Sequence, residues 1–455
     1  MTTTATTARP QGRTAGRPKV VVLGAGFAGL SAVRELAGVD ADVLLVDKNA
    51  YNTFQPLLFQ VATGGLNPGD VTYSLRTFTG GRRRVGFRQG TATGVDADAK
   101  VLRMAEGDDV PYDYLVVSSG IAANYFGIPG AEEHTLTMYT RNGAIEVRDR
   151  LLTAFETAAT SGGADAPCVV VVGGGATGTE MAGAIAELRN TYVAENYPEL
   201  DPSRVRVVCV EMLDFVLAPF DDSLRQYAKR SLEQRGVELR LGAAVAEVRE
   251  DVVVLKGGEE IPSALTVWTS GVSAPKSLSE WGFPQGRGGR LQTEPDLRVQ
   301  GSDAVFAVGD VGAVEGSPLP QLAQPAIQTG KHAAANVKRL VAGLPTVPFS
   351  YSDKGTMAIV GRFSAVADIK WPFARRFTGA IGWLMWMGLH ITLLHSFRNR
   401  LAALANLASH YVSRSGAQNV ITGEPRSVPQ QGRQASDQPR AERDPQLERQ
   451  GGSAA

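Results

Sequence analysis

The sequence predicts an α/β protein with two parallel sheets, and three observations support this. Short β-branched runs alternate with helical stretches, a glycine-rich strand–turn–helix pattern occurs twice, and 455 residues suffice for two or three domains. The 43% apolar and 20% charged residues are typical of a globular chain. The 46 basic and 46 acidic residues balance, so the sequence gives no indication of a nucleic-acid partner.

The first strand–turn–helix unit combines a strand at 19–23, the turn GAGFAG at 24–29 and a helix to Leu36. A second strand at 43–46 ends in Asp47. In a GxGxxG turn the first glycine permits the bend, the second admits a pyrophosphate, and the third lets the helix pack on the strand. The helix N-terminus adds free N–H groups, and the acid accepts ribose hydrogen bonds. The unit predicts a dinucleotide site.

The second unit repeats this order about 150 residues later. A strand at 168–172 leads into GGGATG at 173–178, a helix follows, and the strand at 205–210 ends in Glu211. Two such units predict two bound dinucleotides. A carboxylate at 211 accepts a free 2′-hydroxyl and repels a 2′-phosphate, and the next three residues contain no arginine. The second site is therefore predicted to take NAD rather than NADP.

A third pattern indicates which turn binds which nucleotide. The strand at 304–308 ends in Gly309 and Asp310, and a helix from Pro325 runs to about Val341. A carboxylate there can hold the ribityl hydroxyls of a flavin, and the helix N-terminus favours the negative charge that a flavin gains on reduction. We expect FAD at the first turn and the nicotinamide dinucleotide at the second.

Both cysteines, Cys168 and Cys209, lie inside β-branched runs, which predicts buried thiols without a disulfide or a metal site. Both ends of the chain are poor in large apolar residues and are predicted to be disordered. The expected parts are a disordered tail at 1–17, an FAD-binding domain at 18–164 and 290–345, an NADH-binding domain at 165–289, a C-terminal membrane-associating segment at 346–422, and a disordered tail at 423–455.

From Lys19 to His410 the chain resembles the glutathione-reductase-like flavoprotein reductases and, within them, the type II NADH dehydrogenases (NADH:quinone oxidoreductases). The segments that carry the resemblance are NTFQPLLFQVA (52–62), NYFGIPG (124–130), GATGTE (175–180), AQPAIQ (323–328) and HITLLHSFRNR (390–400). The resemblance implies a single-subunit enzyme that admits electrons to a respiratory chain without pumping protons, by hydride transfer from NADH to FAD and electron transfer to a membrane quinone. The redox cysteine pair of disulfide reductases and the several cysteines of sulfide:quinone reductases are missing from the sequence.

The motifs and the resemblance together predict the site residues. The FAD contacts are expected to be Gly24, Ala25, Gly26, Phe27, Ala28, Gly29, Asp47, Lys48, Asn49, Ala92, Asp310, Ala323 and Gln324. The NADH contacts are expected to be Gly173, Gly175, Gly178, Glu180, Glu211 and Gly271. The resemblance implies catalytic roles for Glu180, Gln324 and Gln328.

Glu180 is expected near the nicotinamide and the flavin, although a first-turn carboxylate also favours the helix dipole. Gln324 and Gln328 are expected to line the quinone pocket, and their spacing of four places them on one helix face. His390 is expected on the quinone side, with a simple packing role as the alternative.

The C-terminal stretch from Phe377 to Phe397 carries no charge and is long enough to cross a bilayer. Its glycines and histidines, its tryptophans Trp383 and Trp386, and the arginines on both flanks favour a helix that lies in the membrane interface. A buried core helix and a spanning helix are the alternatives. We expect a peripheral, monotopic protein on the cytoplasmic face of the cell membrane, and homodimer formation stays open.

Two other functions are compatible with these motifs. One is an NADH-dependent ferredoxin-type reductase, which would lack the uncharged C-terminal stretch. The other is a non-catalytic NAD(H)-sensing flavoprotein that binds a partner at the membrane. NADH oxidation measured with and without a soluble quinone separates all three.

Overall fold

The computed structural model describes residues 16–316, 319–372, 374–413 and 420. The two tails predicted to be disordered, 1–17 and 423–455, lie outside these residues, apart from Gly16 and Arg17.

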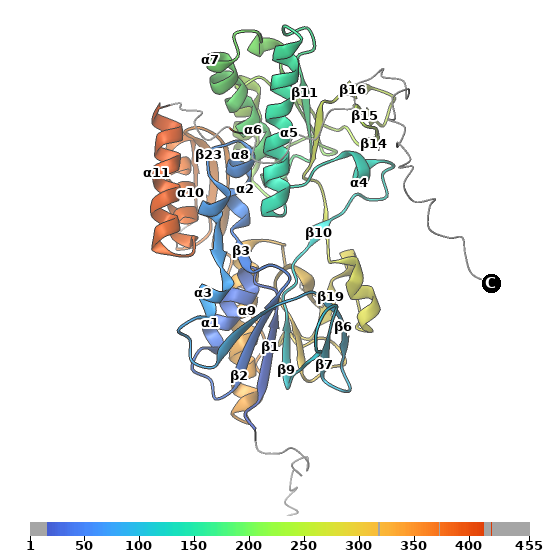
Figure 1. Ribbon diagram of the computed structural model, residues 1–455, viewed down its shortest axis with the longest axis vertical. Coiled ribbons are helices and arrows are strands. Elements are labelled where there is room, and N and C mark those ends of the chain that lie inside the picture. Colours follow the sequence, from blue (N-terminus) through green and yellow to red (C-terminus); the bar gives the residue numbers. More distant parts are fainter. Residues whose placement is uncertain (1–15, 317–318, 373, 414–419, 421–455) are drawn as a thin grey trace, which may run out of the picture. The chain divides into compact units, whose positions relative to one another are not determined.

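The first parallel sheet has five strands in the order β20-β9-β1-β2-β5 (Figure 1). Alternate side chains of its central strand enter two different cores: Val20 and Val22 face one, and Val21 and Leu23 face the other. Burial on both faces explains why this strand is apolar without interruption. The strands are β1 (Lys19–Leu23), β2 (Asp42–Asp47), β5 (Val85–Gln89), β9 (Tyr114–Val117) and β20 (Val305–Ala307).

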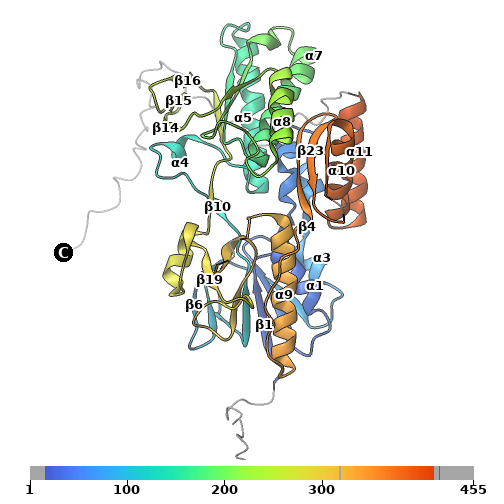
Figure 2. The same cartoon turned by 180° about the vertical axis from the view of Figure 1, so that it is seen from behind.

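Two helices, α1 (Phe27–Leu36) and α9 (Ala323–Val341), cover one face of this sheet and lie side by side (Figures 1 and 2). The close approach depends on Gly330 of α9, because a Cβ there would lie 2.2 Å from the carbonyl oxygen of Ala28. The small sheet β6-β7-β8 contributes to the core on the other face. Its strands are β6 (Ala92–Asp96), β7 (Val101–Met104) and β8 (Val110–Pro111).

The second parallel sheet, β13-β12-β11-β17, repeats this plan. In β11, Val169 and Val171 face the core with the helices, whereas Val170 and Val172 face the core with another three-stranded sheet. The predicted duplication is therefore present in three dimensions. The parallel strands are β11 (Cys168–Val172), β12 (Arg206–Val210), β13 (Val237–Arg240) and β17 (Leu265–Trp268). The helices are α5 (Arg141–Thr160), α6 (Ala176–Leu188) and α8 (Asp222–Gln234). The small sheet consists of β14 (Val245–Val248), β15 (Val252–Leu255) and β16 (Glu260–Pro262).

Two short antiparallel strands, β10 (Ala122–Ala123) and β18 (Val272–Ser273), pair where the chain passes between the two sheets. The remaining short elements are β3 (Tyr51–Thr53), β4 (Thr72–Ser74), α2 (Leu58–Ala62), α3 (Leu75–Thr79), α4 (Ala131–His134), α7 (Ala194–Asn196), β19 (Leu291–Thr293) and β21 (Gly312–Val314).

The C-terminal part differs from the sequence expectation. It begins with an antiparallel sheet of β22 (Gly355–Gly361), β23 (Ser364–Ile369) and β24 (Arg375–Thr378), followed by α10 (Gly379–Leu393) and α11 (Phe397–Ser413). The uncharged stretch from 377 to 397 thus ends a strand, forms α10 and turns at Ser396, whose φ is 72°. No helix among the described residues is long and apolar enough to span a bilayer.

The expectation that Trp383 and Trp386 lie on the surface of an interfacial helix is wrong. Their exposed fractions are 9% and 1%, because both indoles face the protein core. Trp386 packs edge-on against Phe59 of α2, with ring centroids 5.9 Å apart. The exposed apolar side chains of the two helices are instead Ile381, Leu384, Phe397, Leu401 and Leu404.

Strand β22 and the turn after it dock on one face of α6, which carries Glu180, Gly183 and Glu187. A Cβ on Gly183 would lie 2.0 Å from the carbonyl oxygen of Val360. Glu180 Oε1 accepts the N–H of Ile359 at 3.3 Å, and Glu187 Oε2 accepts the N–H of Arg362 at 2.8 Å. This docking places β22 against α6 and brings Trp386 of α10 to Glu180.

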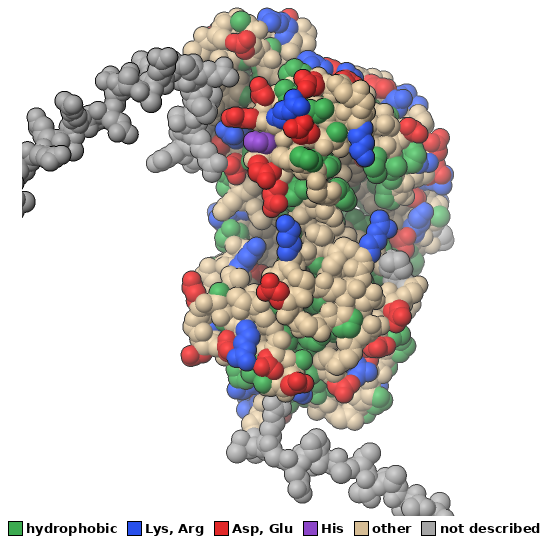
Figure 3. Space-filling model, turned by 90° about the vertical axis from the view of Figure 1, so that its right-hand side faces the viewer, with side chains coloured by type: hydrophobic (Ala, Val, Ile, Leu, Met, Phe, Trp, Pro, Cys, Tyr) green, Lys and Arg blue, Asp and Glu red, His purple; other side chains and the backbone are tan. Residues whose placement is uncertain are grey.

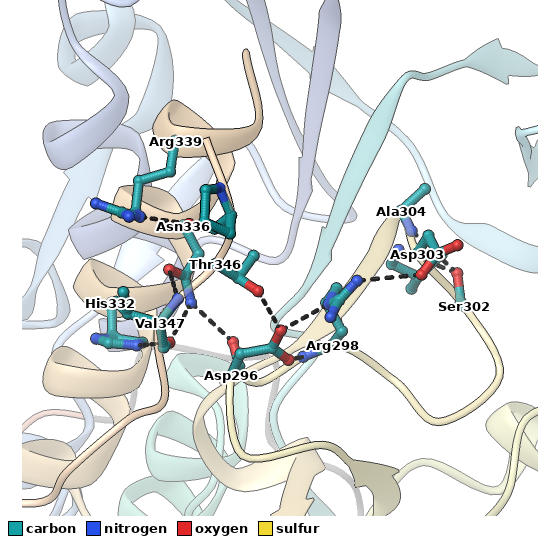
Figure 4. Close-up of polar contacts among 12 residues, drawn as sticks. Asp296, Arg298, Ser302, Asp303, Ala304, His332, Asn336, Arg339, Thr346 and Val347 are labelled. Carbon is teal, nitrogen blue, oxygen red and sulfur yellow. Dashed lines mark hydrogen bonds and ion pairs between the residues drawn. The ribbon is translucent and has the colours of Figure 1, made fainter. Parts of the chain in front are cut away.

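The segment after α9 is held by a polar network (Figure 4). The buried Asn336 amide donates to the carbonyl oxygens of Asp296 and Val347, and its oxygen accepts the N–H of Val347. The Asp296 carboxylate accepts from Arg298 and Thr346, at 2.7 and 2.6 Å. The network fixes the course of the chain from α9 toward β22.

Charged side chains of both signs are interspersed over the described surface that Figure 3 shows. Several form ion pairs, such as Arg206–Glu238 at 2.8 Å and Arg249–Glu247 at 2.9 Å. Exposed pairs of this kind contribute little to stability, because water and salt screen the two charges. The apolar cores, rather than these pairs, decide the fold.

Candidate functional site

The first glycine turn is shaped by close backbone contacts. Gly24 has a φ of 97°, and a Cβ there would lie 2.3 Å from the carbonyl oxygen of Ser118. A Cβ on Gly29 would lie 1.8 Å from the carbonyl oxygen of Gly24. Around Gly26, by contrast, no atom lies within 4 Å of where a Cβ would be. The open position is the one that must admit a pyrophosphate.

The acid at the end of β2 holds this turn in place. Asp47 Oδ2 accepts the N–H of Ala25, and Oδ1 accepts the N–H of Asn49, both at 2.7 Å. The buried Asn52 amide donates to the carbonyl oxygen of Ala25 at 2.6 Å. Burial raises the pKa of Asp47, and the two backbone N–H groups act against that rise. The Asp47 carboxylate thus binds the backbone of the first glycine turn directly.

The second glycine turn repeats these contacts. A Cβ on Gly173 would lie 3.0 Å from Ser270, one on Gly178 would lie 1.8 Å from the carbonyl oxygen of Gly173, and Gly175 again faces open space. Glu211 takes the place of Asp47: Oε2 accepts the N–H of Gly174, and Oε1 accepts the N–H of Leu213. The two turns therefore share one construction.

Two hydroxyl residues complete the parallel, and sequence reasoning missed both. Ser118 Oγ donates to the carbonyl oxygens of Leu23 and Gly24, at 2.8 and 2.9 Å. Thr269 Oγ1 donates to those of Val172 and Gly173. The signal was present, since two hydroxyl residues and then a glycine follow the strand in both repeats, at 118–120 and 269–271.

Other predicted contacts of the first turn lie around it. Lys48 and Asn49 follow Asp47 directly, and the N–H of Gly90 donates to the carbonyl oxygen of Asp47 at 2.9 Å, which brings the start of β6 at Ala92 to the same sheet edge. Phe27 packs edge-on against Phe54, with ring centroids 5.6 Å apart.

The Gly309–Asp310 pair meets the first turn and α9. Gly309 has a φ of 67°, and a Cβ there would lie 3.0 Å from Cβ of Ala28 and 3.5 Å from Cβ of Ala326. Its N–H donates to Thr329 Oγ1 at 2.9 Å. Burial raises the pKa of Asp310 to about 6, and the positive charge of Arg290 acts against that rise. Asp310 is therefore mostly ionised at neutral pH and can accept hydroxyl hydrogen bonds.

Arg290 was not predicted, and nothing in its sequence context marks it. Its guanidinium donates to the carbonyl oxygens of Leu319, at 3.1 Å, and Gly312. These bonds hold the charge beside Asp310. Ala323 and Gln324 form the first turn of α9, which follows this segment.

The two predicted glutamines differ in their surroundings. Both atoms of the Gln328 amide bind the backbone of Ser352: Nε2 donates to the carbonyl oxygen at 2.9 Å and Oε1 accepts the N–H at 3.0 Å. The side-chain amide of Gln324 has no hydrogen-bond partner among the described residues. Gln324 can bind a ligand directly, whereas Gln328 fixes the segment that leads into β22.

Glu180 lies where α6, β22 and α10 meet. Burial raises the pKa of its carboxyl to about 8, against hydrogen bonds from the Ile359 N–H and from Trp386. Trp386 also contacts His390: the two rings stack at 4.0 Å, and Nδ1 of His390 lies 2.7 Å from the carbonyl oxygen of Trp386. Glu180, Trp386 and His390 thus form a line of successive contacts, and sequence reasoning missed its middle member.

His390 also faces the first domain. Its ring lies edge-on to Phe54, with centroids 6.3 Å apart, and Phe54 contacts Phe27. Burial lowers the pKa of His390 to about 4. A neutral imidazole with Nδ1–H donated to a carbonyl keeps a lone pair on Nε2. The described residues show no ring contact or hydrogen bond that joins His390 to Gln324 or Gln328.

The cysteines confirm the prediction of buried, unpaired thiols. Both are free, and burial raises the pKa of Cys168 to about 11 and that of Cys209 to about 12. Two protonated, inaccessible thiols cannot act as a redox pair. Cys168 and Cys209 therefore do not form a redox disulfide.

Comparison with known proteins places this geometry in a known group. The pattern of the pyridine nucleotide-disulphide oxidoreductase family matches residues 18–330. A type II NADH:quinone oxidoreductase of Mycobacterium tuberculosis is 36% identical over 424 residues, which are 89% of this chain and 90% of that protein. One from Staphylococcus haemolyticus is 32% identical over 376 residues, 80% of this chain and 92% of that protein.

Solved structures agree on the fold. NDH2 from Plasmodium falciparum in complex with NADH superposes with a TM-score of 0.79 at 19% identity, over 88% of this chain and all of that one. The sulfide:quinone oxidoreductase of Aquifex aeolicus gives a TM-score of 0.69 at 18% identity, over 86% and 92%. At these identities the likeness concerns the fold alone.

Proposed function

This chain belongs to the type II NADH:quinone oxidoreductases, and on that premise we propose that it transfers a hydride from NADH to FAD and then two electrons to a membrane quinone, without pumping protons. The observation that carries the proposal is the pair of matched glycine turns. Each has its own carboxylate, and the first is also joined by the Gly309–Asp310 pair.

The residues of the first turn fit FAD. Open space faces Gly26, Asp47 binds the turn and can accept hydrogen bonds from a ribose, and the ionised Asp310 can accept those of the ribityl hydroxyls. FAD, when bound, supplies the two-electron chemistry that no side chain of this protein performs. The second turn fits NADH in the same way, and Glu211 favours a free 2′-hydroxyl.

Two side chains are placed to handle protons, and quinone reduction consumes two. Because burial raises the pKa of Glu180 to about 8, its carboxyl holds a proton at neutral pH, and Oε1 accepts the Ile359 N–H. Burial lowers the pKa of His390 to about 4, so the ring is neutral and its Nε2 can accept a hydrogen bond. Trp386 contacts both. We assign Glu180 to the nicotinamide and flavin side of this line and His390 to the quinone side.

Gln324 and Gln328 are assigned to the quinone pocket in different ways. Gln324 offers its amide to the quinone oxygen, because its side chain is not engaged by the described residues. Gln328 acts by positioning, since its amide holds Ser352. Ala323, at the start of α9, would contact the flavin.

We propose peripheral, monotopic attachment at the cytoplasmic face of the cell membrane, as a monomer or a homodimer. The support is the apolar surface of α10 and α11, where Phe397 is 73% exposed and Leu384 63%. Exposure of such a surface to water is unfavourable, and its burial in a lipid interface lowers the free energy. Two flanking arginines have protein partners, Arg376 with Asp221 and Arg400 with Leu394, so the apolar residues carry most of the attachment.

The reaction is tested by NADH oxidation with and without a soluble quinone. Rapid quinone-dependent oxidation is expected; quinone-independent turnover, or none at all, would contradict the proposal. Attachment is tested with lipid vesicles. Replacing Leu401 and Leu404 by serine should release the protein, whereas Leu344→Ser, at an equally exposed leucine after α9, should not.

A further inference from the structure

The segment 124–130 (NYFGIPG) is fastened to the carboxyl end of β17, the strand that borders the second glycine turn. The N–H of Asn124 donates to the carbonyl oxygen of Gly271 at 3.2 Å, and the Trp268 indole donates to that of Asn124 at 3.1 Å. Tyr125 packs on Trp268, with ring centroids 5.7 Å apart. These contacts fix the next residue, Phe126, at the sheet edge.

Phe126 has an unfavourable backbone conformation and an unfavourably exposed apolar side chain. Its φ is 53°, a left-handed conformation that bulky residues rarely adopt, and its side chain is 61% exposed. The strain is held locally, because its N–H donates to Asn124 Oδ1 at 2.9 Å. Strained backbone that the surroundings enforce is concentrated at functional sites.

The ring of Phe126 lies on Gly271. A Cβ on Gly271 would lie 2.3 Å from Cζ and 2.4 Å from Cε2 of the ring, and Gly271 itself has a φ of 72°. A side chain at 271 would therefore displace the ring. Ser270, the preceding residue, lies against Gly173 of the glycine turn. The Phe126 ring thus contacts Gly271, and the neighbouring Ser270 contacts the turn at which the pyrophosphate is predicted to bind.

The strand order gives the direction of a bound dinucleotide. In β13-β12-β11-β17, Glu211 directly follows β12, the glycine turn follows β11, and Gly271 follows β17 on the other side. With the adenosine ribose at Glu211 and the pyrophosphate at the turn, the remaining half extends over β17, because ligands of such sheets lie along the carboxyl edge. That half is the nicotinamide and its ribose.

We propose that Phe126 binds the nicotinamide half of NADH, its exposed ring packing against the ribose and nicotinamide over Gly271. The inference rests on the proposed function, since it takes the second turn as the NADH site. It explains why an apolar ring is held exposed at this edge: the ligand covers it.

The test compares two ligands by calorimetry on the FAD-loaded protein. NAD⁺ has the nicotinamide half and ADP lacks it. Phe126→Ala should weaken NAD⁺ binding roughly three- to tenfold and leave ADP binding unchanged, a range set by the usual strength of one aromatic contact. Phe126→Leu should fall between wild type and alanine. Phe363→Ala is the matched control, because Phe363 is also an exposed phenylalanine with positive φ, at 49% and 54°.

Equal weakening of both ligands would show a general effect on the domain and overturn the proposal, as would unchanged NAD⁺ binding in Phe126→Ala. If wild-type protein failed to bind NAD⁺ at all, the proposed function would fail first. If wild type bound NAD⁺ and reduced its flavin with NADH while the variants matched it, only the role of Phe126 would be wrong.

Discussion

Glu180 gives the protein a defined dependence of stability on pH. Its folded pKa, about 8, is raised from the model-compound value of 4.5 mainly by burial. Between these values the unfolded chain has released the proton and the folded protein retains it. Stability therefore falls as the pH rises through this window and levels off above the folded pKa.

The magnitude follows from the two pKa values. Between about pH 5 and about pH 9, ionisation of this one carboxyl should cost at most roughly 4 kcal/mol of unfolding free energy. Glu180→Gln keeps an oxygen for the Ile359 N–H and cannot ionise, so its stability should lack this component. The free energy of unfolding of Glu180→Gln should therefore increase relative to that of wild type as the pH rises.

The assay is urea unfolding of wild type and Glu180→Gln at several pH values with saturating FAD, followed by tryptophan fluorescence. Subtracting the pH dependence of the unfolding free energy of the variant from that of wild type cancels the contributions of the other titrating groups. Glu280→Gln, at an exposed glutamate, serves as the control and should run parallel to wild type. A difference between Glu180→Gln and wild type that stays constant from acid to alkaline pH would refute the assigned pKa.

Three further outcomes are expected. Asp310→Ala should purify largely without flavin, while Asp303→Ala, at an exposed aspartate nearby, should stay yellow; retained visible flavin absorbance in the first would remove Asp310 from the FAD site. Glu211→Ala should narrow the preference for NADH over NADPH, measured as the ratio of kcat/KM values, and an unchanged ratio would mean that this acid does not read the ribose. Gln328→Leu should slow flavin reoxidation by quinone and leave flavin reduction by NADH near wild type in stopped-flow measurements; slowing of the NADH step alone would place the quinone elsewhere.

The sequence predicted the two parallel-sheet units because their determinants are local. Each glycine turn, its strand and its terminal acid lie within a few dozen residues, and each residue has a steric reason to be what it is. The structure adds a further contact: Asp47 and Glu211 each bind the backbone of their own glycine turn. That second role depends on atomic contacts that spacing alone does not contain.

The C-terminal part was harder to predict because its determinants are distant. Lack of charge from 377 to 397 suits a membrane helix and a buried helix equally, and the sequence expectation placed Trp383 and Trp386 on the wrong side. What buries them is the docking of β22 and α10 near α6 and α2, far away along the chain. One local sign existed: a glycine inside a helix, Gly183, often marks a close backbone approach.

The same docking determines the character of Glu180. The sequence left open that Glu180 is a carboxylate in the first turn of its helix; that alternative is wrong, because Glu180 follows the first turn of α6 (Ala176–Leu188). Here β22 covers it with a backbone N–H and α10 adds Trp386, so the ionised form loses water and gains only two donors. The raised pKa of Glu180 therefore depends on the C-terminal sheet and helix. Substitutions that loosen this contact, such as Gly183→Ala, should lower the pKa of Glu180 toward its ordinary value even though they leave the carboxyl itself unchanged.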